Sequence, residues 1–127
     1  MYENPSHTHR ERSEYWLKLR SRFGPRTDWN GFEEDESLFW QTQGHLFGAP
    51  FYYIEYGIAQ LGALQIWLQS MDSLDGALLN YARAMKLGGK LPLPSLFEAA
   101  ELKFSFGPET VKELIDAVQT RLGDLPA

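Results

Sequence analysis

The segment 50–71 constrains the fold of this chain most, because it is a long apolar run with a single charged residue, Glu55. Its length approaches the ~20 residues that a bilayer-spanning helix needs. However, Gln60, Gln65 and Gln69 would be costly in hydrocarbon, and no basic flank follows the run. The segment therefore predicts a long helix that is buried on most sides within a protein and does not enter a membrane.

The rest of the sequence also has helical periodicity. No stretch alternates apolar and polar residues for long enough to predict a strand, so we expect an all-α fold, a compact bundle of four to five helices. Within it, Leu38, Phe39 and Leu46 are expected to face inward. The apolar periodicity and the stop signals place helices at residues 11–23, 33–46, 50–71, 74–87 and 108–122, with a short one around 95–100.

Several helix ends have recognisable signals. Pro50 suits the first turn of the central helix, because its missing N–H has no partner to lose there. Asp72 or Ser73 can cap the next helix, which a Gly-Gly pair then stops. Phe104 and Phe106 lie in an extended piece between two helices, where they could fill apolar gaps.

Composition limits the classes of function. The chain has 127 residues, 43% of them hydrophobic, which predicts one helical domain over residues 1–127 with residues 1–10 flexible. A net charge of −5 argues against nucleic acid as a partner. There is no cysteine, and the N-terminus has no apolar core of a signal peptide. We therefore expect a cytoplasmic protein without a membrane partner.

A histidine and a group of tyrosines near the start of segment 50–71 are the candidate functional residues: His45, Tyr52, Tyr53 and Tyr56. On a helix that starts near residue 50, Tyr56 shares a face with Tyr52 and Tyr53, because positions three or four apart are neighbours. Phenolic O–H groups in a low-dielectric site can stabilise an oxyanion, and removing one such donor costs roughly 10²–10³ in rate. The alternative is that the tyrosines are ordinary core aromatics and that His45 caps a loop.

Other polar residues give weaker indications. His7 and His9 with Glu11 or Glu14 could form a metal site, but histidines in a polar terminus are usually solvated, and we predict no metal site. A lone carboxylate on an apolar helix, as at Glu55, could be an acid–base group. More often such a carboxylate pairs with an arginine, for which Arg20 and Arg83 are the candidates.

The tyrosine-rich segment belongs to a longer pattern. Trp40 is followed by GHLFGAPFYYIEYGIAQLGAL at residues 44–64, by LGG at 87–89 and by LFEAA at 96–100. From about residue 15 onward, the chain resembles the C-terminal part of the zinc-dependent oligoendopeptidase F-type peptidases, relatives of thimet oligopeptidase. The resemblance implies the helical fold of that part of the family.

The resemblance also implies roles for individual residues. The histidine that corresponds to His45 and tyrosines on the following helix bind substrate and stabilise the tetrahedral intermediate in such enzymes. By spacing, Tyr53 and Tyr56 match the family's tyrosine pair best. Tyr52 is the alternative, because the loop length after the histidine varies.

The zinc-binding half of the family's site is missing from the sequence. None of the three histidines begins a His-Glu-x-x-His helix, and the family's third zinc ligand, a downstream glutamate, would lie before this chain begins. Zinc is the cofactor that the resemblance implies for the family, but we predict no cofactor on this chain. The chain alone should therefore have no zinc peptidase activity.

Two functions follow from the sequence. The first is a C-terminal segment of an oligoendopeptidase-type enzyme, whether truncated gene product, split-enzyme subunit or remnant, that acts on short peptides with a zinc-bearing half or self-associates. The second is a non-catalytic helical module that binds peptides or a protein. An independent module should bury most of Phe51, Ile58, Leu61 and Trp67, whereas a segment of a larger enzyme should leave a large exposed apolar patch or form a dimer to hide it.

Overall fold

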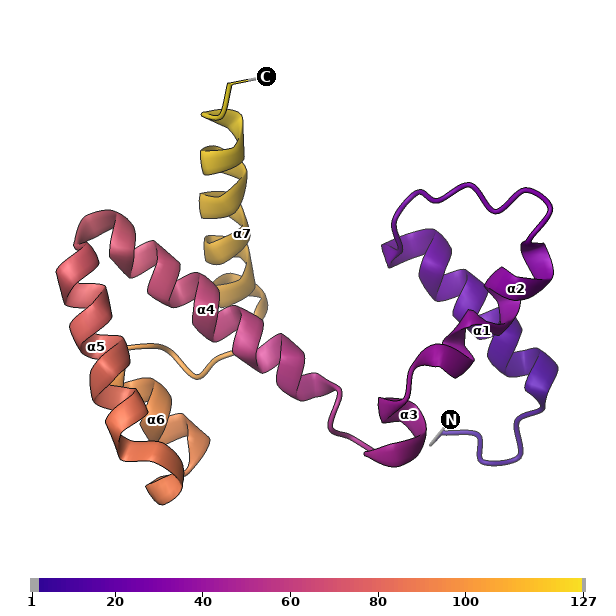
Figure 1. Ribbon diagram of the computed structural model, residues 1–127, viewed down its shortest axis with the longest axis horizontal. Helices are drawn as coiled ribbons and strands as arrows, with labels where there is room; N and C mark the ends of the chain where they lie inside the picture. Colours follow the sequence, from indigo (N-terminus) through magenta and orange to yellow (C-terminus); the bar gives the residue numbers. More distant parts are fainter. Residues whose placement is uncertain (1–2, 127) are drawn as a thin grey trace. The chain divides into compact units, whose positions relative to one another are not determined.

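The computed structural model describes residues 3–126, and all regular structure in this range is helical (Figure 1). The all-α prediction is confirmed. The chain divides into two compact units, Met1–Tyr52 and Tyr53–Ala127. The single domain over residues 1–127 that we expected from the sequence stays a prediction.

The first unit contains four helical segments among its described residues: α1 (His9–Phe23), α2 (Glu33–Leu38), η1 (Phe39–Thr42) and α3 (His45–Gly48). Helix α1 begins slightly before the predicted residue 11 because Thr8 and Glu11 form a capping box. The Thr8 N–H donates to Glu11 Oε2 at 2.6 Å, and the Glu11 N–H donates to the Thr8 hydroxyl at 3.2 Å. Gly24 ends the helix as its N–H donates to the Arg20 carbonyl at 2.8 Å.

The prediction of one helix over residues 33–46 is wrong, because this segment divides into α2, η1 and the start of α3. Trp40 is buried, and its Nε1–H donates to a serine hydroxyl of α1. This packing favours the tighter 3-10 winding of η1, and the glycines that follow weaken any continuous helix. Leu38 is partly buried, but Phe39 and Leu46 are exposed, since Trp40 takes the inward position.

Arg20 joins α1 to α2 within the first unit. Its Nε donates to Glu36 Oε1 at 3.2 Å, and only 13% of its side chain is exposed. The guanidinium lies 5.9, 5.2 and 5.7 Å from the ring centroids of Trp16, Trp29 and Phe39. The indole N–H of Trp16 donates to the Glu36 carbonyl at 3.1 Å. Charge pairing and ring packing therefore act on the same guanidinium.

The second unit contains α4 (Ile54–Asp72), α5 (Leu74–Leu87), η2 (Gly88–Lys90), α6 (Leu93–Ala99) and α7 (Pro108–Gly123). Helix α4 packs against α5 and α7, and α5 packs against α6 (Figure 1). Gly62 permits the close approach of α6 to α4, because a Cβ at this position would lie 3.0 Å from the Phe97 ring. Phe97, Phe104 and Phe106 continue this contact in edge-to-face pairs, with centroids 5.1 and 4.9 Å apart.

Helix α4 begins at Ile54 and not at residue 50 as predicted. Phe51 has a φ of 65°, which is incompatible with a right-handed helix through this position. The expected burial on most sides holds only for the later part of the helix, since residues 64–70 are partly buried whereas Ile54 and Tyr56 are exposed. None of the described helices has the length and hydropathy that crossing a bilayer requires.

The ends of α5 follow the sequence signals. Ser73 is the N-cap, and its hydroxyl accepts a hydrogen bond from the Gly76 N–H at 3.1 Å. Asp72, the other candidate cap, instead ends α4. Gly88 follows α5 with a φ of 55°, a conformation that suits glycine and stops the helix.

Candidate functional site

His45 and Tyr52 lie together in the first unit. His45 begins α3, and its ring stacks on that of Tyr52 with centroids 5.9 Å apart and planes inclined by 8°. Tyr52 lies in the turn that precedes α4. The helical spacing that was expected to place Tyr52 beside Tyr56 therefore does not apply, because α4 begins only at Ile54.

Tyr53 and Tyr56 form the second pair, at the N-terminus of α4. Tyr53 is the N-cap residue and Tyr56 lies in the first turn, so they are three positions apart, and their rings lie 5.7 Å apart at 54°. Both side chains are about half exposed. No side chain caps α4 at this end, so the positive end of its dipole lies at the same place.

Each pair can donate hydrogen bonds from an aromatic surface. A phenolic O–H and an imidazole N–H both donate to carbonyl oxygens, and they do so more strongly when charge develops on the oxygen. The backbone before α4 adds strain at Phe51, where the left-handed φ costs about 1–2 kcal/mol. Such strain is typical of functional sites, where surrounding structure holds it in place.

Two of the histidines, His7 and His9, contact other groups of the first unit. His7 Nδ1 lies 2.6 Å from the Asn4 carbonyl, and His9 Nε2 lies 3.0 Å from Gln41 Nε2. His9 also packs on Trp40 with ring centroids 5.6 Å apart. Within residues 3–126, no group of three or more His, Cys, Asp or Glu side chains is arranged to hold a metal ion. The donor set therefore does not fit the zinc that the family resemblance implies.

Each of the two arginines that the sequence offered as partners of Glu55 pairs with another carboxylate within its own unit. Arg20 pairs with Glu36 in the first unit, and Arg83 Nη1 lies 3.2 Å from Glu101 Oε1 in the second. Glu55 itself is exposed in the first turn of α4, where a carboxylate favours the positive end of the helix dipole. Its position thus has a structural explanation that requires no acid–base role.

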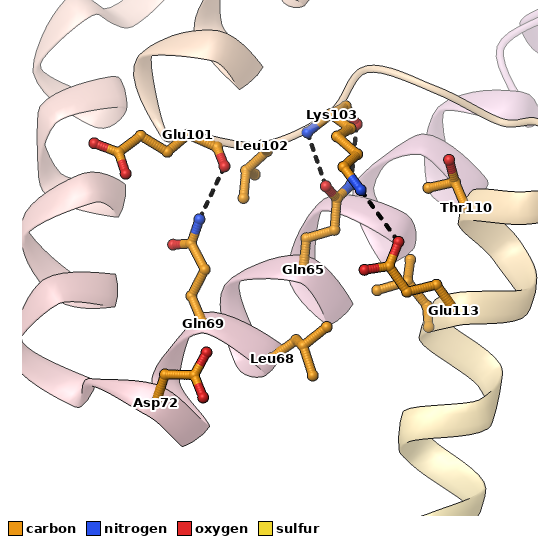
Figure 2. Close-up of a pocket in the computed structure, with 10 residues that line it drawn as sticks. Gln65, Leu68, Gln69, Asp72, Glu101, Leu102, Lys103, Thr110 and Glu113 are labelled. Carbon is orange, nitrogen blue, oxygen red and sulfur yellow. Dashed lines mark hydrogen bonds and ion pairs between the residues drawn. The ribbon is translucent and has the colours of Figure 1, made fainter.

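A shallow pocket of about 180 Å³ lies in the second unit between α4, α7 and residues 101–103 (Figure 2). Most of the charges that line it are already paired. Lys103 Nζ lies 3.2 Å from Glu113 Oε2, and Glu101 pairs with an arginine of α5. None of the four predicted site residues lines this pocket, and its lining shows no arrangement of nucleophile and base.

Two glutamines of α4 hold the wall of this pocket, a role that the sequence analysis missed. Gln65 Nε2 donates to the Lys103 carbonyl at 3.0 Å, and the Lys103 N–H donates back to Gln65 Oε1 at 2.8 Å. One turn later, Gln69 Nε2 donates to the Glu101 carbonyl at 2.9 Å (Figure 2). The signal was present as two amides four positions apart on an apolar helix, a spacing that aligns them on one face.

Comparisons with known proteins give one informative result. No family model matches the chain, and no curated protein matches it. Among solved structures, it matches a 3.1 Å crystal structure of a candidate oligoendopeptidase F, with a TM-score of 0.80 and 29% sequence identity.

The match extends over nearly all of this chain but only a part of the other protein. The match covers 97% of this chain but only 22% of the other, and it falls on a C-terminal part of that protein. The predicted resemblance to the C-terminal part of oligoendopeptidase F-type peptidases is confirmed, in fold and in location.

Proposed function

We propose that this chain is the substrate-side segment of an oligoendopeptidase-type zinc peptidase, and that it acts on short peptides together with a zinc-bearing polypeptide. The observation that carries the proposal is the match over 97% of this chain to 22% of a candidate oligoendopeptidase F. A shared fold does not by itself assign a function, so the proposal rests in addition on the side chains that this segment presents.

The proposed substrate-binding residues are His45, Tyr53 and Tyr56, with Tyr52 as the alternative to one tyrosine. Tyr53 and Tyr56 are adjacent at the uncapped N-terminus of α4, where phenolic O–H groups and the helix dipole would stabilise the same oxyanion. His45 would donate to the substrate backbone, with Tyr52 stacked on its ring and limiting its orientation. The proposed partner would hold the zinc, which would supply an activated water for the hydrolysis.

The chain is proposed to be inactive alone. Oxyanion donors accelerate hydrolysis only where a nucleophile attacks, and the described residues offer no donor set for the metal that generates it in this family. The partner is therefore a polypeptide that carries the His-Glu-x-x-His helix. A cytoplasmic location is part of the same proposal, as is the exclusion of nucleic acid, which rests on the net charge of −5.

The second candidate function is a non-catalytic helical module that binds peptides or a protein. The burial of the apolar residues favours the peptidase segment over this alternative. Phe51 is 75% exposed, and Ile58, Leu61 and Trp67 are only partly buried. An independent module would bury such residues, whereas a segment of a larger enzyme leaves them for the rest of that enzyme to cover.

The proposal is tested by complementation. The zinc-bearing part is supplied as the matched oligoendopeptidase F without the region that this chain covers, and hydrolysis of a fluorogenic short peptide is measured. We expect no turnover from this chain with added zinc, and turnover when the two polypeptides are mixed. Substitutions Tyr53→Phe and Tyr56→Phe should each lower kcat by roughly 10²–10³.

The exposed Tyr15 of α1 provides the matched control, because Tyr15→Phe removes a phenolic O–H to which the proposal gives no role. Zinc-dependent turnover by the chain alone would refute its proposed inactivity. Equal rates for the Tyr15, Tyr53 and Tyr56 variants of a complemented enzyme would refute the roles of the tyrosines. Peptide binding by the isolated chain, without turnover in any mixture, would favour the non-catalytic module.

A further inference from the structure

Helix α5 turns small side chains toward its neighbours and large apolar side chains toward solvent. Ala77 is buried and Ala84 is partly buried, on the face that packs against the other helices of the second unit. The adjacent face carries four exposed apolar residues, which we name the α5 stripe. Their exposed fractions are 61% for Leu74, 53% for Leu78, 48% for Tyr81 and 61% for Met85.

The spacing of the α5 stripe is that of a helix-pairing seam. Its members are separated by four, three and four positions, which corresponds to consecutive d, a, d and a positions of a heptad. Ala82 is exposed next to the seam, and its small side chain permits close approach of a second helix. An exposed stripe of this kind is suited to a helix with the same periodicity.

We propose that the α5 stripe binds the α5 stripe of a second copy of this chain, in an antiparallel pair with two-fold symmetry. The charges beside the stripe favour this orientation. Asp75 lies in the first turn of α5 and Lys86 in the last, both on the same side of the stripe. In an antiparallel pair each Asp75 lies on the same flank and at the same end as Lys86 of the second copy, whereas a parallel two-fold pair places the charges of the two copies on opposite flanks of the seam, where they cannot pair.

The area of the stripe limits the size of the interface that the pair can form. The four exposed fractions amount to about two whole side chains, or ~400 Å² per copy, about half of the ~800 Å² that a specific interface of standard size buries. Interfaces of standard size range from about micromolar to picomolar affinity, so we expect this smaller one to be weak, with a dissociation constant of about 1 μM or higher. This inference concerns α5 alone and does not depend on the proposed peptidase function.

Sedimentation equilibrium of the full chain tests the pairing, over loading concentrations from about 5 to 500 μM, above the expected lower limit of the dissociation constant. We expect the average mass to rise from that of one chain toward two. Leu78→Glu places a charge in the stripe and should raise the dissociation constant more than about tenfold. Leu79→Glu makes the same change at an exposed position of α5 outside the stripe and should alter it less than about threefold.

A charge exchange tests the orientation. Asp75→Lys and Lys86→Asp should each weaken the pair roughly fivefold, by creating two like-charge contacts, and the double variant should recover most of the affinity. Circular dichroism of each variant checks that the helices are retained.

Three results would overturn the inference. The chain could remain a monomer up to the highest concentration, or Leu78→Glu and Leu79→Glu could weaken association equally. Alternatively, the zinc-bearing polypeptide of the complementation assay could bind the wild-type chain and the Leu79→Glu variant but not the Leu78→Glu variant. The stripe would then belong to the enzyme partner and not to a second copy.

Discussion

Glu101 holds a backbone conformation that glycine would adopt at lower cost, so Glu101→Gly is expected to stabilise the second unit. Its φ is 58°, directly after α6. The Glu101 N–H donates to the Glu98 carbonyl and the Leu102 N–H donates to the Phe97 carbonyl, both at 2.9 Å. These two bonds form a Schellman motif, in which the residue at this position is usually glycine.

The magnitude follows from three contributions. A left-handed conformation costs an L-residue about 1–2 kcal/mol, and replacement by glycine removes this cost. Glycine in turn destabilises the folded state by about 0.5–1 kcal/mol, because its unfolded chain has more conformational entropy to lose. The substitution also removes the ion pair with Arg83, whose side chains are 56% and 60% exposed, so this loss is only about 0.3 kcal/mol. We expect a net gain of about 0.5 kcal/mol in the free energy of unfolding.

Glu101→Ala is the matched control, because it removes the same ion pair but keeps the strained Cβ. It should destabilise the second unit slightly, so the glycine and alanine variants should differ by about 1 kcal/mol. For a unit of this size, that difference corresponds to roughly 4–8 °C in Tm. Urea and thermal unfolding followed by circular dichroism measure it. Equal stability of the two variants would refute the assignment of strain to this φ.

Three further predictions concern other contacts. Arg20→Lys should destabilise the first unit by about 1–2 kcal/mol, since lysine cannot form the same planar contacts with three rings, whereas Arg10→Lys on the exposed side of α1 should have no measurable effect in urea unfolding. Gln65→Leu should destabilise the second unit by about 1–2 kcal/mol and accelerate hydrogen exchange at the Lys103 amide, and an unchanged exchange rate would contradict the role of this glutamine. Hydrogen bonds from the backbone N–H and the hydroxyl of the N-cap threonine hold the pKa of Glu11 below its ordinary value of 4.5. The stabilisation of α1 by these bonds is therefore complete above pH 4.5, and it is lost as the pH falls through the pKa of Glu11 in the folded state. An NMR titration of this carboxyl with a midpoint at 4.5 or higher would contradict the capping box.

Helices with local signals could be predicted from the sequence. The helix predicted over residues 74–87 has the observed bounds of α5, and the helix predicted over residues 108–122 has the observed start of α7. These predictions succeed because Ser73, Gly88 and Pro108 act on the backbone directly around them. These signals require no knowledge of the rest of the fold.

The segments 33–46 and 50–53 could not be predicted in the same way. The first is divided because Trp40 packs against α1, a contact between residues far apart in the sequence. The second is kept out of α4 by the left-handed φ of Phe51, a residue type that gives no local indication of this conformation. Helical periodicity alone therefore extended both predicted helices too far.

The candidate site was found through the family resemblance more than through the residues themselves. Periodicity brought Tyr53 and Tyr56 together correctly as a pair, because the N-cap residue and the first turn of α4 are three positions apart. It could not predict the stacking of His45 on Tyr52, which depends on the turn before α4. The roles of these residues stay predictions until the complementation assay is made.

The exposure of Tyr53 and Tyr56 to water limits how strongly their O–H groups can stabilise an oxyanion. Tyr53 and Tyr56 are about half exposed, so water competes for their O–H groups and screens the dipole of α4. Oxyanion donors have their full effect only where water is excluded. A partner that covers this end of α4 would therefore strengthen these donors while it supplies the metal-activated nucleophile. Catalysis would then depend on association, because association excludes water from the tyrosine O–H groups. Substitutions at the covered surface should therefore lower kcat as well as the affinity between the two polypeptides.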